Sequence, residues 1–263
     1  MNARKILSFI TIVFAILFVF ICASVFSPHV LQVFSSNSNK VPIYSVDVPD
    51  KKVAITFDCA WGADDIGAIL SSLKKENIKA TFFLVGAWMK KYPEQVKAIA
   101  ADGHDIANHS DTHPHMNQLS VEKIKQEIRD ANTKIEQLTG KKCILFRVPY
   151  GEYNDKVLKS VQEEEQYAIQ WDVDSLDWKD LPAENICDRV LKKVKNGSVI
   201  LMHNDTKYTA AALRALIKGL KDKGYSIVPV SGLIHKENYY LDYEGRQYLR
   251  KTGNLFQSTC FDQ

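Results

Sequence analysis

From residue 43 onward, short apolar runs alternate with segments in which apolar residues recur at helical spacing. The runs predict seven strands, at residues 53–57, 81–85, 105–108, 144–147, 167–171, 199–202 and 226–230. Amphipathic helices are predicted between them, for example from Ile66 to Leu73, and the longest begins after Ser120 and ends at Gly140. This alternation predicts an α/β domain built on either a (β/α) barrel or a doubly wound sheet.

An apolar run of 21 residues without a charge, 6–26, precedes the domain. About 20 residues suffice for a helix to cross the hydrocarbon core. Arg4 and Lys5 precede the run and the next basic residue is Lys40, so the positive-inside rule keeps residues 1–5 in the cytoplasm. We expect a single-pass anchor in the cell membrane, a stem at 27–42 and an extracellular domain. The alternative is a signal peptide cleaved near Cys22-Ala23-Ser24, which also exports the domain.

The composition excludes several classes of protein. With 46% apolar and 25% charged residues, most of the chain is neither disordered nor fibrous. The net charge of +3 includes Arg4 and Lys5, so the rest is nearly neutral and gives no indication of nucleic-acid binding. The five cysteines form no C-x-x-C pair, which argues against a disulfide framework or a zinc finger, and Cys187 falls on the apolar face of a predicted helix.

Polar residues with catalytic character stand at or directly after five of the seven predicted strands. Parallel strands bring their C-terminal ends to one face of the fold, where sites are built. We therefore expect these side chains to converge: Asp58, His109, Arg147, Asp172, Asp177 and His203.

His109 and His113 are four residues apart in HSDTH, a spacing that brings two imidazoles to one side of a helical turn, where they can bind one metal. His115 adds a third imidazole nearby, at an offset that directs it elsewhere. The alternative is a set of surface or capping histidines.

Five segments together resemble a known family. They are TFDCAWG (56–62), HSDTH (109–113), RVPYG (147–151), DVDSLDW (172–178) and LMH (201–203). In this order they resemble the motifs of the polysaccharide deacetylases, the NodB-like enzymes of carbohydrate esterase family 4. The resemblance covers about residues 43–235 and leaves 236–263 as a C-terminal extension. It implies a distorted, incomplete (β/α) barrel. The apolar N-terminus and the TFDxxWG variant resemble the sporulation-associated branch.

The resemblance implies metal-dependent amide hydrolysis with two proton-transfer residues. Asp58 is the expected general base and His203 the general acid. Arg147 is expected to orient Asp58, and Asp177 to orient His203.

The remaining implied roles concern substrate and metal. The backbone N–H of Tyr150 is expected to stabilise the oxyanion, with Trp178 and Leu201 walling an acetyl-methyl pocket. His109 and His113 are the expected ligands of a divalent metal, zinc in first place. The family carries a second aspartate as a ligand where this chain has Cys59. A thiolate can bind zinc, and the alternative is a two-histidine site that is weak or empty.

Three functions are compatible with these residues. The leading one is removal of N-acetyl groups from peptidoglycan N-acetylglucosamine or N-acetylmuramic acid, with an N-acetylated polysaccharide and the membrane as partners. A membrane-anchored carbohydrate-binding protein of the same fold with weak or no activity is the alternative, favoured by Cys59 alone. An esterase for O-acetyl groups would use the same residues.

Overall fold

The computed structural model describes residues 41–250. The expected membrane-spanning run at 6–26 and nearly all of the expected stem lie outside them. Within residues 41–250, no helix is long and apolar enough to cross a membrane.

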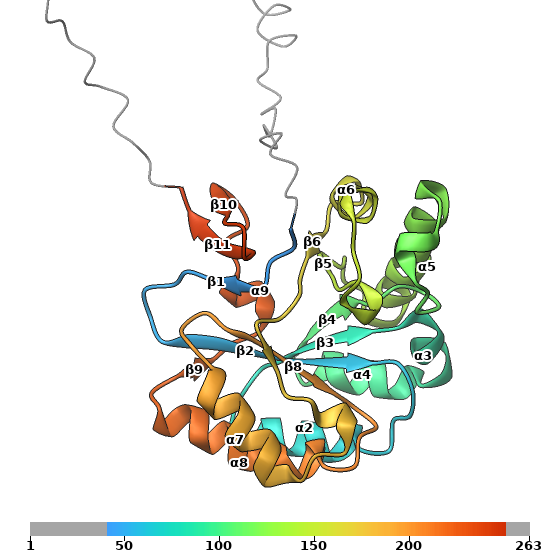
Figure 1. Cartoon of the computed structure of the whole chain (residues 1–263). Coiled ribbons are helices and arrows are strands. Elements are labelled where there is room, and N and C mark those ends of the chain that lie inside the picture. The colour runs from blue at the N-terminus through green and yellow to red at the C-terminus, as the bar shows by residue number, and fades with distance from the viewer. Residues whose placement is uncertain (1–40, 251–263) are drawn as a thin grey trace, which may run out of the picture. The chain divides into compact units, whose positions relative to one another are not determined.

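Strands and helices alternate along most of the described chain, as the pattern of apolar residues predicts (Figure 1). In chain order the elements are β1 (Ser45–Val46), β2 (Lys52–Cys59), α2 (Ile66–Lys75), β3 (Thr81–Leu84), α3 (Gly86–Lys91), α4 (Pro93–Ala101), β4 (Asp105–Asn108), η1 (Met116–Gln118), α5 (Val121–Thr139), β5 (Leu145–Phe146), η2 (Pro149–Gly151), α6 (Asp155–Glu163), β6 (Tyr167–Ala168), β7 (Val173–Asp174), η3 (Asp177–Lys179), α7 (Ala183–Lys193), β8 (Val199–His203), α8 (Thr209–Asp222), β9 (Ser226–Ile227), α9 (Val230–Leu233), β10 (Tyr239–Leu241) and β11 (Arg246–Leu249).

The main sheet is parallel and follows the order β6-β5-β4-β3-β2-β8-β7, with β9 pairing the start of β2. This is the circular order of a barrel, because chain neighbours are sheet neighbours and the late strand β8 returns to pair with β2. The circle is broken between β6 and β7, which are the two ends of the strand order. A doubly wound sheet would instead reverse its strand order at a switch point. The incomplete barrel is therefore confirmed.

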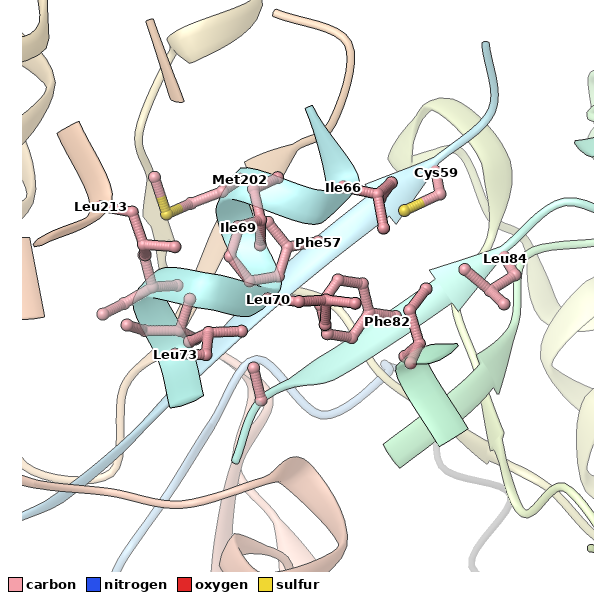
Figure 2. Packing of buried hydrophobic residues seen from close by; sticks show 14 of the residues in the cluster. Phe57, Cys59, Ile66, Ile69, Leu70, Leu73, Phe82, Leu84, Met202 and Leu213 are labelled. Atoms are coloured by element: carbon pink, nitrogen blue, oxygen red, sulfur yellow. The ribbon is translucent and has the colours of Figure 1, made fainter. Parts of the chain in front are cut away.

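Residues of β2 alternate between the two faces of the sheet, as the pleat requires. Val53, Ile55, Phe57 and Cys59 join one hydrophobic cluster with the outer helices, including Ile69 and Leu73 of α2 and Leu213 of α8. Figure 2 shows Phe57 and Cys59 among these side chains. The alternate residues belong to the opposite face, where Ala54 enters a second cluster and the polar Thr56 and Asp58 lie.

The longest helix agrees with the sequence. The Ser120 hydroxyl accepts a hydrogen bond from the Lys123 N–H at 3.3 Å, which caps the start of α5. Gly140, with a φ of 68°, ends the helix in the left-handed conformation.

The strands beside the break in the barrel differ from the prediction. A strand at 167–171 was expected, but β6 ends at Ala168, because Ile169 and Gln170 pair instead with Ile43 at the start of the domain. The expected strand at 226–230 is likewise shortened to β9, and α9 begins at Val230. The two-residue strand β7 was not predicted, since no apolar run marks it.

A second, small sheet joins the two ends of the described chain. β10 and β11 form an antiparallel hairpin, and β11 pairs in parallel with β1. Part of the region expected to be a C-terminal extension is thus hydrogen-bonded to the start of the domain.

Candidate active site

Asp58 and His203 are direct neighbours on adjacent parallel strands. They are register partners at the C-terminal ends of β2 and β8. Neighbouring strands lie about 4.8 Å apart, and residues in register share a face of the sheet. The sheet itself therefore brings the predicted base and the predicted acid together.

Arg147 is buried beneath Asp58 with no exposed surface. Its Nη1 donates to Asp58 Oδ1 at 2.6 Å and to Thr56 Oγ1 at 2.9 Å. Nε and Nη2 donate to the carbonyls of Ile169 and Gln170 at 3.4 and 3.2 Å. A buried charge is tolerated only when it is paired and hydrogen-bonded in this way. The arrangement fixes the Asp58 carboxylate in one orientation.

The charges around Asp58 keep it ionised. Burial raises the pKa of its carboxyl, but the Arg147 guanidinium, and the His109 and His203 imidazoles when they are protonated, lower it by more, so the net pKa lies below the ordinary value. Asp58 is therefore a carboxylate at neutral pH, the form that can accept a proton.

The His203 ring is held by Asp177. Nδ1 lies 2.8 Å from Asp177 Oδ1, while Oδ2 accepts hydrogen bonds from the His203 backbone N–H at 2.7 Å and the Thr209 hydroxyl at 2.5 Å. Because a carboxylate only accepts, Nδ1 carries a proton and Nε2 is left for substrate. Burial lowers the pKa of His203, but its hydrogen bond and charge interaction with Asp177 raise it by more, so the net pKa is raised.

The two histidines of HSDTH lie together beside Asp58. His109 Nδ1 is 2.8 Å from the Arg147 carbonyl oxygen and must donate to it, which leaves Nε2 unprotonated, 3.5 Å from Asp58 Oδ2. The His113 ring is 4.9 Å from the His109 ring. Burial lowers the pKa of His109, and lowers that of His113 to about 4, so both are neutral at pH 7. Two neutral imidazoles, one oriented by a backbone carbonyl, fit a divalent metal.

Cys59 is not brought to these histidines. Its side chain lies on the helix-covered face of β2, fully buried beside apolar residues such as Ile66 and Leu84 (Figure 2). Burial and the nearby Asp58 and Asp65 carboxylates raise the pKa of its thiol well above the usual value. Within residues 41–250, no three His, Cys, Asp or Glu side chains form a group that could hold a metal ion. The expected set of His109, His113 and Cys59 is thus not assembled.

The loops that carry the site contain strained residues. Ser110, His113, Tyr150 and Leu176 have φ values of 68°, 60°, 60° and 56°. Non-glycine residues in this region cluster at functional sites, where surrounding contacts enforce them.

Glu127 of α5 supplies such contacts to the HSDTH loop. Its carboxylate accepts from the backbone N–H groups of Asp111 and Thr112 at 2.9 and 2.8 Å and from the Thr112 hydroxyl at 2.7 Å. The helix thereby fixes the loop that presents His109 and His113.

The three residues predicted to contact substrate differ in their exposure. Leu201 is buried on β8, in register with Thr56 and two residues before His203, so it shares their face of the sheet. Trp178, in η3, and Tyr150, in η2, are 54% and 53% exposed. Their expected contacts with substrate remain predictions.

One strand-end residue lies elsewhere. Asp172 accepts from the Val199 N–H and the Ser198 hydroxyl, both at 2.9 Å, at the start of β8 rather than at its C-terminal end. Sequence reasoning also missed three supporting residues: Thr56, Glu127 and Thr209. For Thr56 a signal existed, since it shares a strand face with Asp58. Glu127 and Thr209 lie on the helices α5 and α8, and the apolar pattern of those helices does not show that these side chains contact the HSDTH loop and Asp177.

Comparisons with known proteins identify the family of this chain. A family model described as polysaccharide deacetylase matches residues 45–169. The chain is 38% identical over 193 residues to the uncharacterized protein YlxY of Bacillus subtilis, a match that covers 73% of this chain and 60% of YlxY. It is 36% identical to a peptidoglycan-N-acetylglucosamine deacetylase of Bacillus cereus, covering 69% of this chain and 68% of that protein.

The fold also matches solved structures. A CE4 family pseudoenzyme from Bacillus anthracis superposes with a TM-score of 0.72 at 36% identity, covering 75% of this chain and 70% of that one. The match spans less than two thirds of the length of YlxY, but slightly more than two thirds of the Bacillus cereus deacetylase. The arrangement of Asp58, Arg147, Asp177 and His203 on an incomplete barrel is thus accompanied by similarity over most of the domain, and the chain belongs to the polysaccharide deacetylase family.

Proposed function

We propose that this protein hydrolyses the N-acetyl groups of peptidoglycan sugars, either N-acetylglucosamine or N-acetylmuramic acid, and releases acetate. The observation that carries the proposal is the pairing of Asp58 with His203 across β2 and β8, each with its own buried partner, Arg147 or Asp177. A protein that only binds sugar has no need of two proton-transfer groups with opposed pKa shifts.

In the proposed reaction, the Asp58 carboxylate accepts a proton from the attacking water, and the oxygen of that water bonds to the acetyl carbonyl carbon. The developing oxyanion is stabilised by the backbone N–H of Tyr150. His203, protonated at Nε2 and held through Nδ1 by Asp177, gives that proton to the amine nitrogen as the C–N bond breaks. The products are acetate and a free amino sugar.

His109 and His113 would hold a divalent metal, zinc in first place, and when bound it would polarise the acetyl carbonyl and lower the pKa of water. The remaining coordination positions would be left to water and substrate, because Cys59 faces the hydrophobic cluster.

The proposal is tested by acetate release from N-acetylglucosamine oligomers and from peptidoglycan, with metal analysis of the same preparation. The position of the new free amine identifies which of the two sugars is the substrate. Acetate release by the wild-type chain that is lost in Asp58→Asn supports hydrolysis, whereas no release from either material contradicts it.

A second function is favoured by one observation, the burial of Cys59 away from the histidines. A chain that lacks a third metal ligand would be a weak enzyme or a carbohydrate-binding protein. A similar structure, of a mutant of the Bacillus anthracis pseudoenzyme, is described as having restored enzymatic activity. For this chain, oligosaccharide binding without acetate release at any zinc concentration would support the second function.

We further propose that residues 6–26 anchor the protein in the cell membrane with the domain outside, because basic residues flank only the N-terminal side of this apolar run. Protease added to intact protoplasts should digest the domain and spare a short fragment. Survival of the full-length chain would contradict this orientation. The sporulation-associated branch also remains a prediction, which the timing of expression during spore formation tests.

A further inference from the structure

The HSDTH loop, residues 109–113, carries the two predicted metal ligands at its two ends. Between them Ser110 has a φ of 68°, and His113 itself has a φ of 60°. Residues other than glycine adopt this left-handed conformation at a cost in free energy, and they keep it only where surrounding contacts enforce it. The separation of the two imidazoles therefore depends on groups outside the loop.

Glu127, on the helix α5, makes three contacts with the middle of this loop. Its Oε2 accepts hydrogen bonds from the backbone N–H groups of Asp111 and Thr112 at 2.9 and 2.8 Å, and its Oε1 accepts from the Thr112 hydroxyl at 2.7 Å. Hydrogen bonds from backbone N–H groups to an ionised carboxylate are among the strong ones in proteins. One side chain thus fixes the backbone at two residues that lie between the histidines.

The Glu127 carboxylate serves this loop alone. Within residues 41–250, it has no hydrogen bond or ion pair with any other group. The next residue, Ile128, is fully buried and belongs to a hydrophobic cluster, which holds the helix in place at this point. The loop is therefore fastened to a rigid part of the fold.

Two further contacts between the loop region and α5 act at other points. Asn108 Oδ1 accepts from the Ser110 N–H at 2.7 Å, while its Nδ2 donates to the Ile128 carbonyl at 2.8 Å. Lys134 Nζ lies 2.7 Å from Asp111 Oδ1. The first contact fixes the start of the loop, and the second holds a side chain without fixing the backbone.

Such support matters more where protein ligands are few. The predicted metal site has two, His109 and His113, because Cys59 lies in the hydrophobic cluster on the other face of β2. Ordering a loop during binding costs conformational entropy, and residues that hold the ligands in advance avoid that cost. The metal affinity of this chain should therefore depend strongly on the contacts that order its loop.

We propose that Glu127 is a positioning residue for the metal site, because by fixing Asp111 and Thr112 it holds the imidazoles of His109 and His113 at one separation. The inference rests on the metal site of the proposed function. It concerns the affinity for a divalent metal and not the transfer of protons.

The test is titration of the zinc-free, full-length chain with zinc, with denaturant unfolding of the same preparations. Glu127→Ala removes the acceptor and keeps a residue that favours the helix. Zinc affinity should fall by roughly tenfold, the lower end of the effect of losing an outer-shell partner. Glu127→Gln should recover most of the affinity, because its amide oxygen can accept from both N–H groups while its NH₂ donates to the Thr112 hydroxyl.

Lys134→Ala is the matched control, since Lys134 lies on the same helix and contacts the same loop, but only through the Asp111 carboxylate. It should bind zinc as the wild type does. Unchanged zinc affinity in Glu127→Ala would overturn the inference even if this variant is less stable, because the contacts would then serve the fold alone. An equal loss in Lys134→Ala would also overturn it, as would a wild type that binds no zinc. A loss in Glu127→Gln as large as that in Glu127→Ala would assign the effect to charge, and would overturn the positioning role.

The inference and the proposed hydrolysis fail separately, because zinc titration requires no turnover. Reduced zinc affinity in Glu127→Ala, with a wild type that releases no acetate, contradicts hydrolysis and supports the positioning role. Acetate release by the wild type, with unchanged zinc affinity in Glu127→Ala, does the reverse.

Discussion

Two groups of residues occupy the same end of the sheet but are supported in different ways. Asp58 and His203 lie on neighbouring strands, and each contacts a buried partner of opposite charge. His109 directly follows β4, and His113 lies further along the same loop. The family's third ligand is replaced by Cys59, whose side chain faces the helices. The difference teaches that proton transfer is built into the sheet, whereas metal affinity depends on one loop. The two properties should therefore respond to different substitutions.

The largest effect is expected for Asp58→Asn, which removes the base. Acetate release should fall roughly 10²–10⁴-fold. The fully buried Arg147 also loses its counter-charge, so the free energy of unfolding should fall by about 3–5 kcal/mol, measured by denaturant titration. Asp172→Asn is the control, because this partly buried carboxylate supports the other end of β8. A comparable loss of rate in both variants would remove the distinction between the two strand ends.

The histidine loop is tested by His113→Ala. Zinc affinity should fall by more than the roughly 10–100-fold that loss of an outer-shell partner causes, because an imidazole ligand itself is removed. His115→Ala, which deletes the neighbouring imidazole, should keep wild-type zinc affinity. Equal zinc affinity in wild type and His113→Ala, measured by titration, would contradict the proposed metal site.

A smaller effect is expected for Cys59→Ser. If the thiol is a packed apolar group, zinc affinity should not change, and the buried hydroxyl should lower the free energy of unfolding by about 1–3 kcal/mol. Cys59→Asp should destabilise the domain more, because it places a carboxylate among apolar residues, or should create zinc affinity that the wild type lacks. A sharp loss of zinc affinity in Cys59→Ser would instead make the thiolate a ligand.

The smallest effect is expected in the pH dependence of acetate release. A raised pKa keeps His203 protonated to higher pH, so acetate release should decline only above the ordinary histidine pKa of about 6.5. Asp177→Asn removes the charge that raises this pKa and should move the alkaline limb of kcat/KM to lower pH. Thr209→Val leaves the charge and should move it less. By linkage, the His203–Asp177 ion pair contributes its whole share to the free energy of unfolding below the unfolded pKa of about 6.5. This contribution is lost as pH rises through the raised pKa of the folded protein. An unmoved alkaline limb in Asp177→Asn would assign it to another group.

The sequence predicts local features of this fold better than its pairings. Apolar periodicity and capping residues placed α5 between Ser120 and Gly140. The register that joins Asp58 to His203 could not be predicted, because strand order depends on contacts between segments far apart in the chain. The same limit hid the pairing of β11 with β1.

The orientation of Cys59 was within reach of the sequence. In an extended strand, residues next to each other point to opposite faces, so an inward Asp58 implies an outward Cys59. The predicted strand ended at residue 57, whereas β2 continues through Cys59. The sequence could not distinguish Asp172 from Asp177, because both follow the same predicted strand. Only Asp177 contacts His203 in the structure.

The register between β2 and β8 has a consequence for how such a protein can diversify. The separation of base and acid is set by the spacing of two hydrogen-bonded strands, about 4.8 Å, and not by any loop. Trp61, Tyr150 and Trp178, by contrast, all stand on connections beyond the strand ends. Under the proposed function, insertions and exchanges in those connections would change which glycan is recognised, while the proton-transfer geometry stays constant. For protein engineering, the sheet can serve as a constant scaffold onto which loops for other acetylated polymers are grafted.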